Sequence, residues 1–206
     1  MPQAPSLPSP ASGGGVKNLP GQSMSPESDL TRIKLFANRL ALRAFTPADA
    51  PEIFAAVSPT ITRFMAWDPS PSLAAFAEVW RQWLPRMTAG TDLSLVIRLT
   101  STDEFVGVAG VHGIGSAEPE VGIWLKETAH GLGYGREAVA AIVQWARAHI
   151  GATALIYPVA KQNLPSRRLA ESLHGVIVGE RKLRKSSGVV LDEVVYRIPA
   201  ATDRSK

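Results

Sequence analysis

Apolar and polar residues recur along the chain at two different periods, and these periods predict where strands and helices lie. Apolar residues at every second position, or in short runs, are typical of strands, whereas spacings of three and four are typical of helices. The pattern predicts strands over residues 39–45, 93–99, 105–114, 120–125, 153–159, 176–183 and 193–198. It predicts helices over residues 47–57, 61–67, 72–87, 137–150 and 166–173.

Residues between these segments agree with the assignment. Thr46 is a good helix N-cap, and Pro47 then occupies the first helical position, so a helix begins directly after the first strand. Gly175 is expected to end the helix over residues 166–173, because glycine readily adopts the left-handed conformation found after helix ends. Residues 185–188 are expected to form the turn of a closing hairpin.

The order of these elements predicts the fold class. The three strands between residues 93 and 125 are joined by short connections, so they are expected to pair in antiparallel fashion. A helix and another strand follow, which predicts one right-handed crossover between parallel strands. The sequence therefore predicts an α+β protein with a mixed, mostly antiparallel sheet flanked by helices, and not a doubly wound fold.

Length and composition indicate one domain. The chain has 206 residues, of which 45% are apolar, and this suffices for one sizeable core. Residues 29–206 are expected to form the domain, and the Pro-, Gly- and Ser-rich residues 1–28 to form a disordered tail. The apolar runs are too short to span a membrane. The absence of cysteine excludes disulfides, thiolate metal sites and a cysteine nucleophile, and it fits a cytoplasmic protein.

The net charge of +4 is concentrated in one segment. Residues 161–185 carry seven basic and two acidic side chains, a local charge of +5, so the rest of the chain is close to −1. Such a segment indicates an anionic partner. Nucleic acid is one candidate, although the segment has neither interleaved aromatic residues nor a nucleic-acid motif. The basic residues are Lys161, Arg167, Arg168, Arg181, Lys182, Arg184 and Lys185.

A glycine-rich loop, His130–Arg136, separates the strand over residues 120–125 from the next helix. A glycine loop that opens a helix offers free N–H groups and the positive end of the helix dipole, so it is suited to a phosphate. It is not a P-loop, because Arg136 and Glu137 follow the last glycine in place of lysine and serine or threonine. It also lacks the third glycine of the dinucleotide-binding motif. A glycine turn without a ligand is the remaining alternative.

The spacing x-x-x-G-x-G at the helix start resembles the acyl-CoA pyrophosphate loop of the GCN5-related N-acetyltransferases (GNAT), with His130 where Arg or Gln is usual. The resemblance extends from about residue 39 to residue 199 and points to the RimJ/RimL-like branch. It implies the acyl-CoA N-acyltransferase fold. Five pieces in the right order carry it: residues 39–50, 121–125, 133–138 and 163–175, and Asp192 with Tyr196.

The resemblance implies an enzyme that moves an acetyl group from acetyl-CoA, its co-substrate, to a primary amine by direct attack and without a metal. The branch implies a protein N-terminus as acceptor, such as that of a ribosomal protein, and a polyamine or antibiotic amine is the alternative. A non-catalytic acyl-CoA-binding regulator is a further alternative, against which the presence of Asn163 and Ser166 argues. The expected partners are acetyl-CoA and the acceptor, with a homodimer as a possible assembly and no membrane or nucleic acid.

The resemblance also assigns residues to acetyl-CoA. The main chain of the loop would hold the pyrophosphate, and Ile123 and Leu125 would pair with the pantetheine arm as an extra strand. Asn163 would bind a pantetheine amide or serve only as a helix-entry residue, and Arg168 is suited to the 3′-phosphate by its charge. The loop residues are His130, whose role is either structural or in contact with the co-substrate, and Gly131, Gly133, Tyr134, Gly135 and Arg136.

Catalytic roles follow from the same resemblance. The amide of Ile123 would polarise the thioester carbonyl. Ser166 would protonate the departing thiolate or serve only as a helix cap. Glu120 would guide the amine proton away, directly or through water, with Glu118 as the second candidate. The acceptor would contact Trp67 and Asp68, near Phe64 and Met65, and Tyr196 would either reach the thioester or lie in the core.

Overall fold

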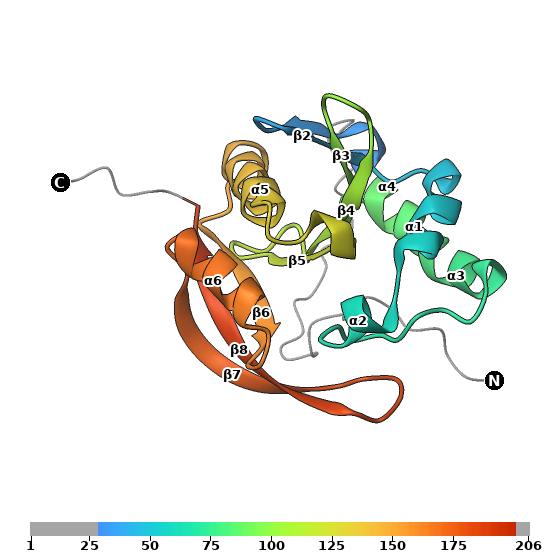
Figure 1. Cartoon of the computed structure of the whole chain (residues 1–206). Helices are drawn as coiled ribbons and strands as arrows, with labels where there is room; N and C mark the ends of the chain where they lie inside the picture. The colour runs from blue at the N-terminus through green and yellow to red at the C-terminus, as the bar shows by residue number, and fades with distance from the viewer. Residues whose placement is uncertain (1–28, 201–206) are drawn as a thin grey trace, which may run out of the picture.

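The computed structural model describes residues 29–200, which form an eight-stranded sheet with helices on both faces (Figure 1). The predicted tail, residues 1–28, lies outside the described residues. The strand order is β1-β2-β3-β4-β5-β6-β8-β7, and only β5 and β6 pair in parallel. This confirms the predicted mixed, mostly antiparallel α+β sheet. The strands are β1 (Lys34–Phe36), β2 (Leu40–Ala44), β3 (Asp92–Leu99), β4 (Phe105–His112), β5 (Glu120–Leu125), β6 (Ala154–Ala160), β7 (Val176–Arg184) and β8 (Val190–Pro199).

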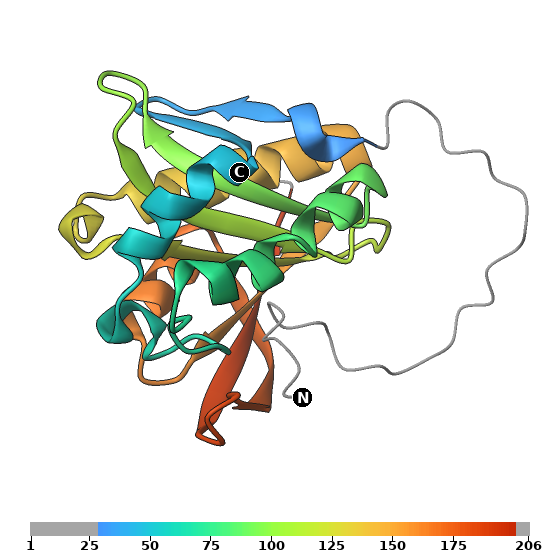
Figure 2. The same ribbon diagram turned by 90° about the vertical axis from the view of Figure 1, so that its right-hand side faces the viewer.

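Helices form a layer on each face of the sheet. Helices α1 (Ala50–Ala56), α3 (Leu73–Trp80) and α4 (Trp83–Thr88) cover the face that is turned toward the viewer in Figure 2. Helices α5 (Tyr134–Ile150) and α6 (Leu164–Ser172) cover the other face, and α2 (Pro59–Thr62) follows α1. Short 3₁₀ turns lie at Leu30–Arg32, Pro47–Asp49 and Glu127–Ala129. Within residues 29–200, no helix has the length and apolar character needed to cross a bilayer.

Several elements differ from the prediction. The helix expected over residues 61–67 lies earlier and is shorter, at Pro59–Thr62. The single helix expected over residues 72–87 is divided into α3 and α4, with Arg81 and Gln82 between them. The cause is Pro85, which has no N–H to donate and whose ring would clash with the carbonyl of Arg81 in a continuous helix. The pattern also missed β1, because three residues are too few to display a period.

The end of α6 shows a further difference. The helix spans residues 164–172, and His174, with φ of 62°, takes the left-handed position that was expected of Gly175. Gly175 is needed for another reason: a Cβ on it would lie 2.7 Å from the Ala170 carbonyl oxygen. The glycine therefore allows the chain to pass close to the helix end.

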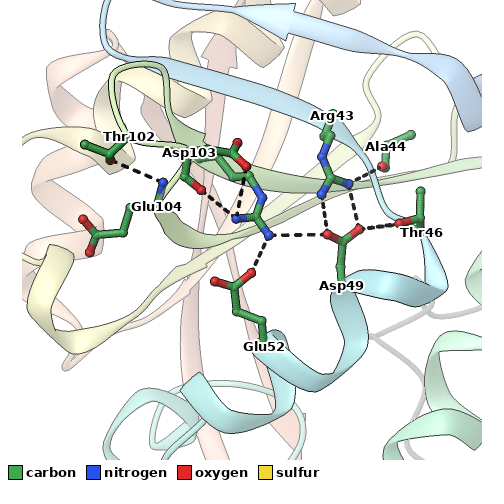
Figure 3. A network of polar contacts seen from close by, with 9 residues as sticks. Arg43, Ala44, Thr46, Asp49, Glu52, Thr102, Asp103 and Glu104 are labelled. Carbon is green, nitrogen blue, oxygen red and sulfur yellow. Dashed lines mark hydrogen bonds and ion pairs between the residues drawn. The ribbon is translucent and has the colours of Figure 1, made fainter.

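A buried carboxylate fixes the connection from β2 to α1 (Figure 3). Asp49 is 3% exposed and pairs with Arg43, whose Nη1 lies 2.7 Å from Oδ2. The same carboxylate accepts from the Thr46 amide at 2.9 Å and hydroxyl at 2.8 Å, which confirms the predicted helix start at Thr46 and Pro47. Arg98 of β3 lies 3.5 Å from Oδ1 and also pairs with Glu52.

Replacing Asp49 with asparagine should lower the free energy of unfolding by about 2–4 kcal/mol, because two arginines lose a buried partner. Burial raises the pKa of Asp49, but hydrogen bonds from Arg43 and Thr46 outweigh it, so the pKa lies below its usual value. A lowered folded-state pKa stabilises the protein above the unfolded pKa, and this stabilisation is lost as pH falls through the folded-state pKa. Urea unfolding should therefore show a full deficit for the variant at pH 7 and a smaller one below about pH 4.

Asp103 provides the matched control for this prediction. Its carboxylate also faces Arg98, at 3.9 Å, but the side chain is 87% exposed. Asp103→Asn should therefore change stability by less than about 1 kcal/mol. Equal losses for the two variants would contradict the role given to Asp49.

Candidate active site

The sheet opens between β5 and β6. These strands pair only at Glu120 and Ile156 within the described residues, although β5 continues to Leu125. On its other side β5 pairs with β4 along its whole length. Beyond Glu120, the edge of β5 that faces β6 is therefore without a strand partner in the described part of the chain.

Alternation along β5 decides which main-chain groups lie at this open edge. Lys126, which follows the strand, donates its N–H to the carbonyl of Val106 in β4, at 2.9 Å. Main-chain polar groups along a strand point to opposite sides at successive residues. Ile123 and Leu125 therefore point their N–H and C=O groups toward the gap, and these are the two residues predicted to pair with the pantetheine arm.

His130 lies just beyond the end of β5. Its Nε2 lies 2.9 Å from the Leu125 carbonyl oxygen, so the ring links the start of the glycine loop to the strand. This contact engages the Leu125 carbonyl, which leaves the N–H of Leu125 and both polar groups of Ile123 facing the gap. The structure thus gives His130 a structural contact, one of its two predicted alternatives.

The glycine loop has the backbone form of an anion cradle. Gly131 and Gly133 have φ of 75° and 81°, values that residues with a side chain rarely adopt. A Cβ on Gly131 would meet no atom within 4 Å, so the space above the loop is open. Helix α5 begins at Tyr134, and its first N–H groups lack intrahelical acceptors. Free donors and the helix dipole therefore point into this open space.

Gly135 and Arg136 lie in the first turn of α5 and differ in their surroundings. Gly135 is buried, and a Cβ on it would lie 2.9 Å from Cδ1 of Leu169 in α6. This third glycine therefore allows α5 and α6 to pack closely. Arg136 is exposed beside the loop.

Arg39 braces the loop, which the sequence pattern did not reveal. Its Nη2 donates to the Leu132 carbonyl at 3.1 Å, and its Nε lies 2.8 Å from a carboxylate oxygen of Glu137. Its guanidinium also lies 4.6 Å from the centre of the Tyr134 ring. Arg39 stands almost a hundred residues before the loop, so no local spacing could have linked them.

Helix α6 begins at the gap, and its first turn shows whether Ser166 is the helix cap. Asn163 is the helix N-cap, since its Oδ1 accepts from the Ser166 amide at 3.3 Å. The Ser166 hydroxyl instead lies 2.7 Å from the hydroxyl of Tyr157 in β6. Ser166 is therefore not the cap, and its side chain lines the cleft together with Asn163.

Tyr157 is a residue that the sequence reasoning missed. Burial raises its pKa to about 12, against the opposing hydrogen bond with Ser166. The phenol therefore stays protonated at neutral pH and can donate to the Ser166 oxygen.

The basic segment over residues 161–185 is mostly neutralised by contacts within the fold. Lys161 pairs with Glu180 at 2.6 Å, and Lys182 pairs with Asp192 at 3.1 Å. Arg168 differs: it is exposed on α6, and within residues 29–200 it makes no ion pair or hydrogen bond. Arg167 and Arg184 likewise make no ion pair in this part of the chain, but each donates a hydrogen bond within the fold. Arg168 is therefore the side chain of this segment best placed for an anion.

An aromatic cleft lies on the face of the sheet opposite α5 and reaches the gap. It encloses about 1220 Å³ of space outside atoms, its open mouth included. The predicted acceptor residues Trp67 and Asp68 line it, and Trp67 packs edge-to-face against Trp124 with ring centres 6.5 Å apart. Other apolar side chains of the wall are Phe54, Phe64, Met65, Phe76, Val79, Trp83 and Leu183.

The tip of the β7–β8 hairpin closes one side of this cleft. Lys185 is buried, with its Nζ 2.6 Å from Asp68 and 3.0 Å from the Thr62 carbonyl oxygen. Ser186 donates to the same carboxylate at 3.2 Å. The hydrogen bond from Lys185 holds the pKa of Asp68 below its usual value.

Glu120 lies in the cleft and is paired. Its Oε2 is 3.0 Å from Nη1 of Arg181, and Nε of the same arginine is 2.6 Å from Glu193, which is 4% exposed. Burial opposes the charge of Arg181, but the hydrogen bonds that it donates to the two glutamates outweigh this and raise its pKa. Glu118, the second candidate, pairs with Arg197 at 2.7 Å and does not line the cleft.

Tyr196 is placed away from the cleft. The side chain is 1% exposed, and its hydroxyl donates to Glu171 at 2.7 Å and accepts from Arg167 at 3.1 Å. Both partners belong to α6. The position agrees with the core alternative and not with a contact to the acceptor.

Comparisons with known proteins agree with this geometry. A family model described as an acetyltransferase (GNAT) domain matches residues 39–176. Among curated proteins no sequence matches the chain. Three solved acetyltransferase structures are similar to this chain in fold.

Mycobacterium smegmatis RimJ in complex with CoA-disulfide is 19% identical, with a TM-score of 0.71 over 86% of this chain and 90% of that chain. A candidate ribosomal-protein-serine acetyltransferase from Vibrio cholerae is 19% identical, with a TM-score of 0.68 over 82% and 98%. Spermidine N-acetyltransferase from Vibrio cholerae, with CoA and spermine, is 17% identical, with a TM-score of 0.68 over 79% and 96%.

Proposed function

Because the chain belongs to the GNAT acetyltransferase family, we propose that its acetyl acceptor is the α-amine of a protein N-terminus. The protein is an acetyl-CoA-dependent N-acetyltransferase, so one amine must reach the thioester carbon in the cleft. The likeness to RimJ and to the candidate ribosomal-protein-serine acetyltransferase supports this acceptor, and the likeness to spermidine N-acetyltransferase supports a polyamine instead.

The observation that carries the proposal is that the acidic side chains of the cleft are already paired. Asp68 pairs with Lys185, and Glu120 and Glu193 share Arg181. A polyamine carries several positive charges and is recognised best by carboxylates that are free to receive them. The remaining wall is mostly aromatic and aliphatic, and this suits a single amine attached to an uncharged first residue.

Acetyl-CoA fits the residues on the opposite side of the gap. The N–H groups at Gly131–Arg136 suit a pyrophosphate, and the open edge at Ile123 suits an extended amide chain. Asn163 and the exposed Arg168 are our candidates for the pantetheine amide and the 3′-phosphate. The thioester supplies the activated acetyl group, and the Ile123 N–H is our candidate donor to its carbonyl oxygen.

Ser166 is our candidate acid for the leaving sulfur. Its hydroxyl lines the cleft, and the protonated Tyr157 hydroxyl stands behind it at 2.7 Å. If Tyr157 donates to the Ser166 oxygen, the serine proton is free to point into the cleft. A thiolate that departs there would receive this proton, and Tyr157 would support the serine oxygen.

The acceptor is tested by comparing amines with the full chain. Acetyl-CoA is mixed separately with short peptides that begin with serine or alanine, with spermidine and with an aminoglycoside, and release of free thiol is followed. We expect the highest kcat/KM with peptides, and mass spectrometry should locate the acetyl group on the α-amine.

An N-formylated peptide of the same sequence, with an internal lysine, is the matched control and should release no thiol. Preference for spermidine would refute the N-terminal acceptor and leave the family activity intact. Binding of acetyl-CoA without thiol release for any amine would support a non-catalytic regulator.

A further inference from the structure

A histidine that is absent from the roles above lies in the same cleft. His112 ends β4, is 6% exposed, and lines the cleft beside Glu120, its cross-strand neighbour. Its Nδ1 lies 2.8 Å from Oδ1 of Asp92, which is its cross-strand neighbour on β3. Histidine and aspartate therefore form a dyad on the sheet face that the acceptor must approach.

The partner of His112 decides the position of its proton. An ionised carboxylate can only accept, so Nδ1 carries the proton in the contact with Asp92. Burial raises the pKa of Asp92, but hydrogen bonds from His112 and Thr91 outweigh it and keep that pKa below its usual value. The carboxylate is therefore ionised at neutral pH. The neutral ring then has its lone pair on Nε2.

One glycine makes room for the His112 ring, and a second glycine beside it leaves open space. A Cβ on Gly110 would lie 2.8 Å from Nε2 of His112, so the ring lies along the glycine. Gly110 is opposite Gly122 of β5, where an added Cβ would meet nothing within 4 Å. This open space adjoins Ile123, the candidate donor to the thioester. An amine seated over Gly122 would lie between Nε2 and the reacting carbonyl.

The competing candidate, Glu120, is less suited to accept a proton. Both oxygens of its carboxylate already accept from Arg181, at 3.0 and 3.5 Å. Within residues 29–200 the His112 ring makes one hydrogen bond, with Asp92, and that bond leaves Nε2 free. Glu120, which lies opposite His112 on the neighbouring strand, is better suited to stabilise the positive charge of the His112 ring once the ring has accepted a proton.

We propose that His112, positioned by Asp92, is the base that accepts the proton of the acceptor ammonium. The inference rests on the acetyl-transfer function above. The ammonium gives one proton to Nε2, and the free amine forms a bond to the acetyl carbon while the carbon–sulfur bond breaks. Ser166 gives its proton to the departing sulfur, and the second proton of the nitrogen passes to the Ser166 oxygen, directly or through water, so that the thiol forms and the serine is restored. The third stays on the product amide, and His112 returns its proton to solvent.

Charged groups around His112 come from five elements. Asp92 on β3 and Glu120 on β5 are its cross-strand neighbours, and Arg86 on α4 lies near Asp92. Arg181 and Glu193, from β7 and β8, line the same cleft. The pH test below therefore includes a Glu120 variant as well as changes to the dyad.

The test uses His112→Asn, whose amide can still donate to Asp92 but has no group at the position of Nε2. An α-amine has a pKa near 8, so about a tenth of it is free at pH 7. We expect kcat/KM to fall about 10- to 100-fold at pH 7 and the deficit to close near pH 9.5, where the amine is already free. Asp92→Asn should give a smaller deficit of the same pH dependence. Acetyl-CoA affinity should stay unchanged in both.

His149→Asn is the matched control, because His149 lies on α5 and its Nδ1 contacts the Trp145 carbonyl at 3.1 Å. It should leave the pH profile unaltered. His112→Gln replaces His112→Asn if circular dichroism shows that the latter does not fold. An unchanged rate, or a loss that is equal at every pH, would overturn the proposal, as would a pH-dependent loss in Glu120→Gln alone. The test requires that the wild type releases thiol with one of the amines. If the amine that reacts is spermidine, the proposed peptide acceptor is refuted, and the same variants are then compared with spermidine.

Discussion

Replacing Gly133 with valine should weaken acetyl-CoA binding about 100-fold or more while the protein remains folded. Gly133 is the N-cap of α5 with φ of 81°, a conformation that costs a branched side chain about 1–2 kcal/mol. A Cβ there would also lie 3.5 Å from the Arg39 guanidinium, which braces the loop. The loop should relax to a negative φ and turn its N–H groups away from the pyrophosphate.

The size of this effect follows from the contacts that are lost. Hydrogen bonds to a charged group contribute about 1.5–3 kcal/mol each, so losing two of them corresponds to roughly 100-fold or more in affinity. Isothermal titration with acetyl-CoA measures the change. Urea unfolding of the same variant should show a loss of only about 1–2 kcal/mol.

Gly151→Val is the matched control for Gly133. Gly151 caps the other end of α5, its φ is 64°, and a Cβ there would meet nothing within 4 Å. The substitution introduces the same kind of strain far from the loop, so stability should fall and acetyl-CoA affinity should not. Equal affinity for wild type and a folded Gly133→Val protein would refute the cradle.

Replacing Ser166 with alanine should lower kcat about 10²- to 10⁴-fold, the usual contribution of a positioned acid. Because Asn163 caps α6, the helix should keep its start, and stability should change little. Acetyl-CoA affinity should be almost unchanged, since a proton donor to the leaving sulfur acts in the transition state and not in binding. Single-turnover measurements of thiol release test this directly.

Ser172→Ala provides the matched control in the same helix. The Ser172 hydroxyl donates to the Leu169 carbonyl at 2.7 Å and is exposed, so its loss should leave turnover unaltered. Tyr157→Phe should lower kcat less than Ser166→Ala, because Tyr157 acts only through the serine. Wild-type turnover in Ser166→Ala would show that the hydroxyl is not the acid.

The glycine loop shows how far local pattern reaches. Gly131 and Gly133 were assigned to an anion cradle, and their positive φ values fit this assignment. A local pattern can indicate such positions, because backbone conformation depends mainly on neighbouring residues. Gly135 was assigned to the same cradle. It is also required for packing, because a Cβ on it would lie against Leu169, which comes close only after α6 has folded against α5. A glycine required for packing and one required for φ are identical in a sequence.

Helix α6 shows a similar division. The motif Asn163-x-x-Ser166 was found from the sequence, but two roles remained for the serine. The structure excludes the cap, because Asn163 fills that position and the serine hydroxyl meets Tyr157 from a neighbouring strand. Tyr157 could not be found from sequence, since one tyrosine in an apolar strand looks like any core residue.

Sequence by itself determined seven of the eight strands, most helices, the mixed sheet and the glycine loop, because periodicity and turn residues act over a few positions. Tertiary structure decided what the cleft contains. His112 meets Asp92, Lys185 meets Asp68, and Glu120 shares Arg181 with Glu193 only when the sheet has formed. These contacts join residues from separate strands and loops, and their charge and hydrogen bonding depend on distance in space. That distance is fixed by the packing of the whole sheet and not by spacing along the chain.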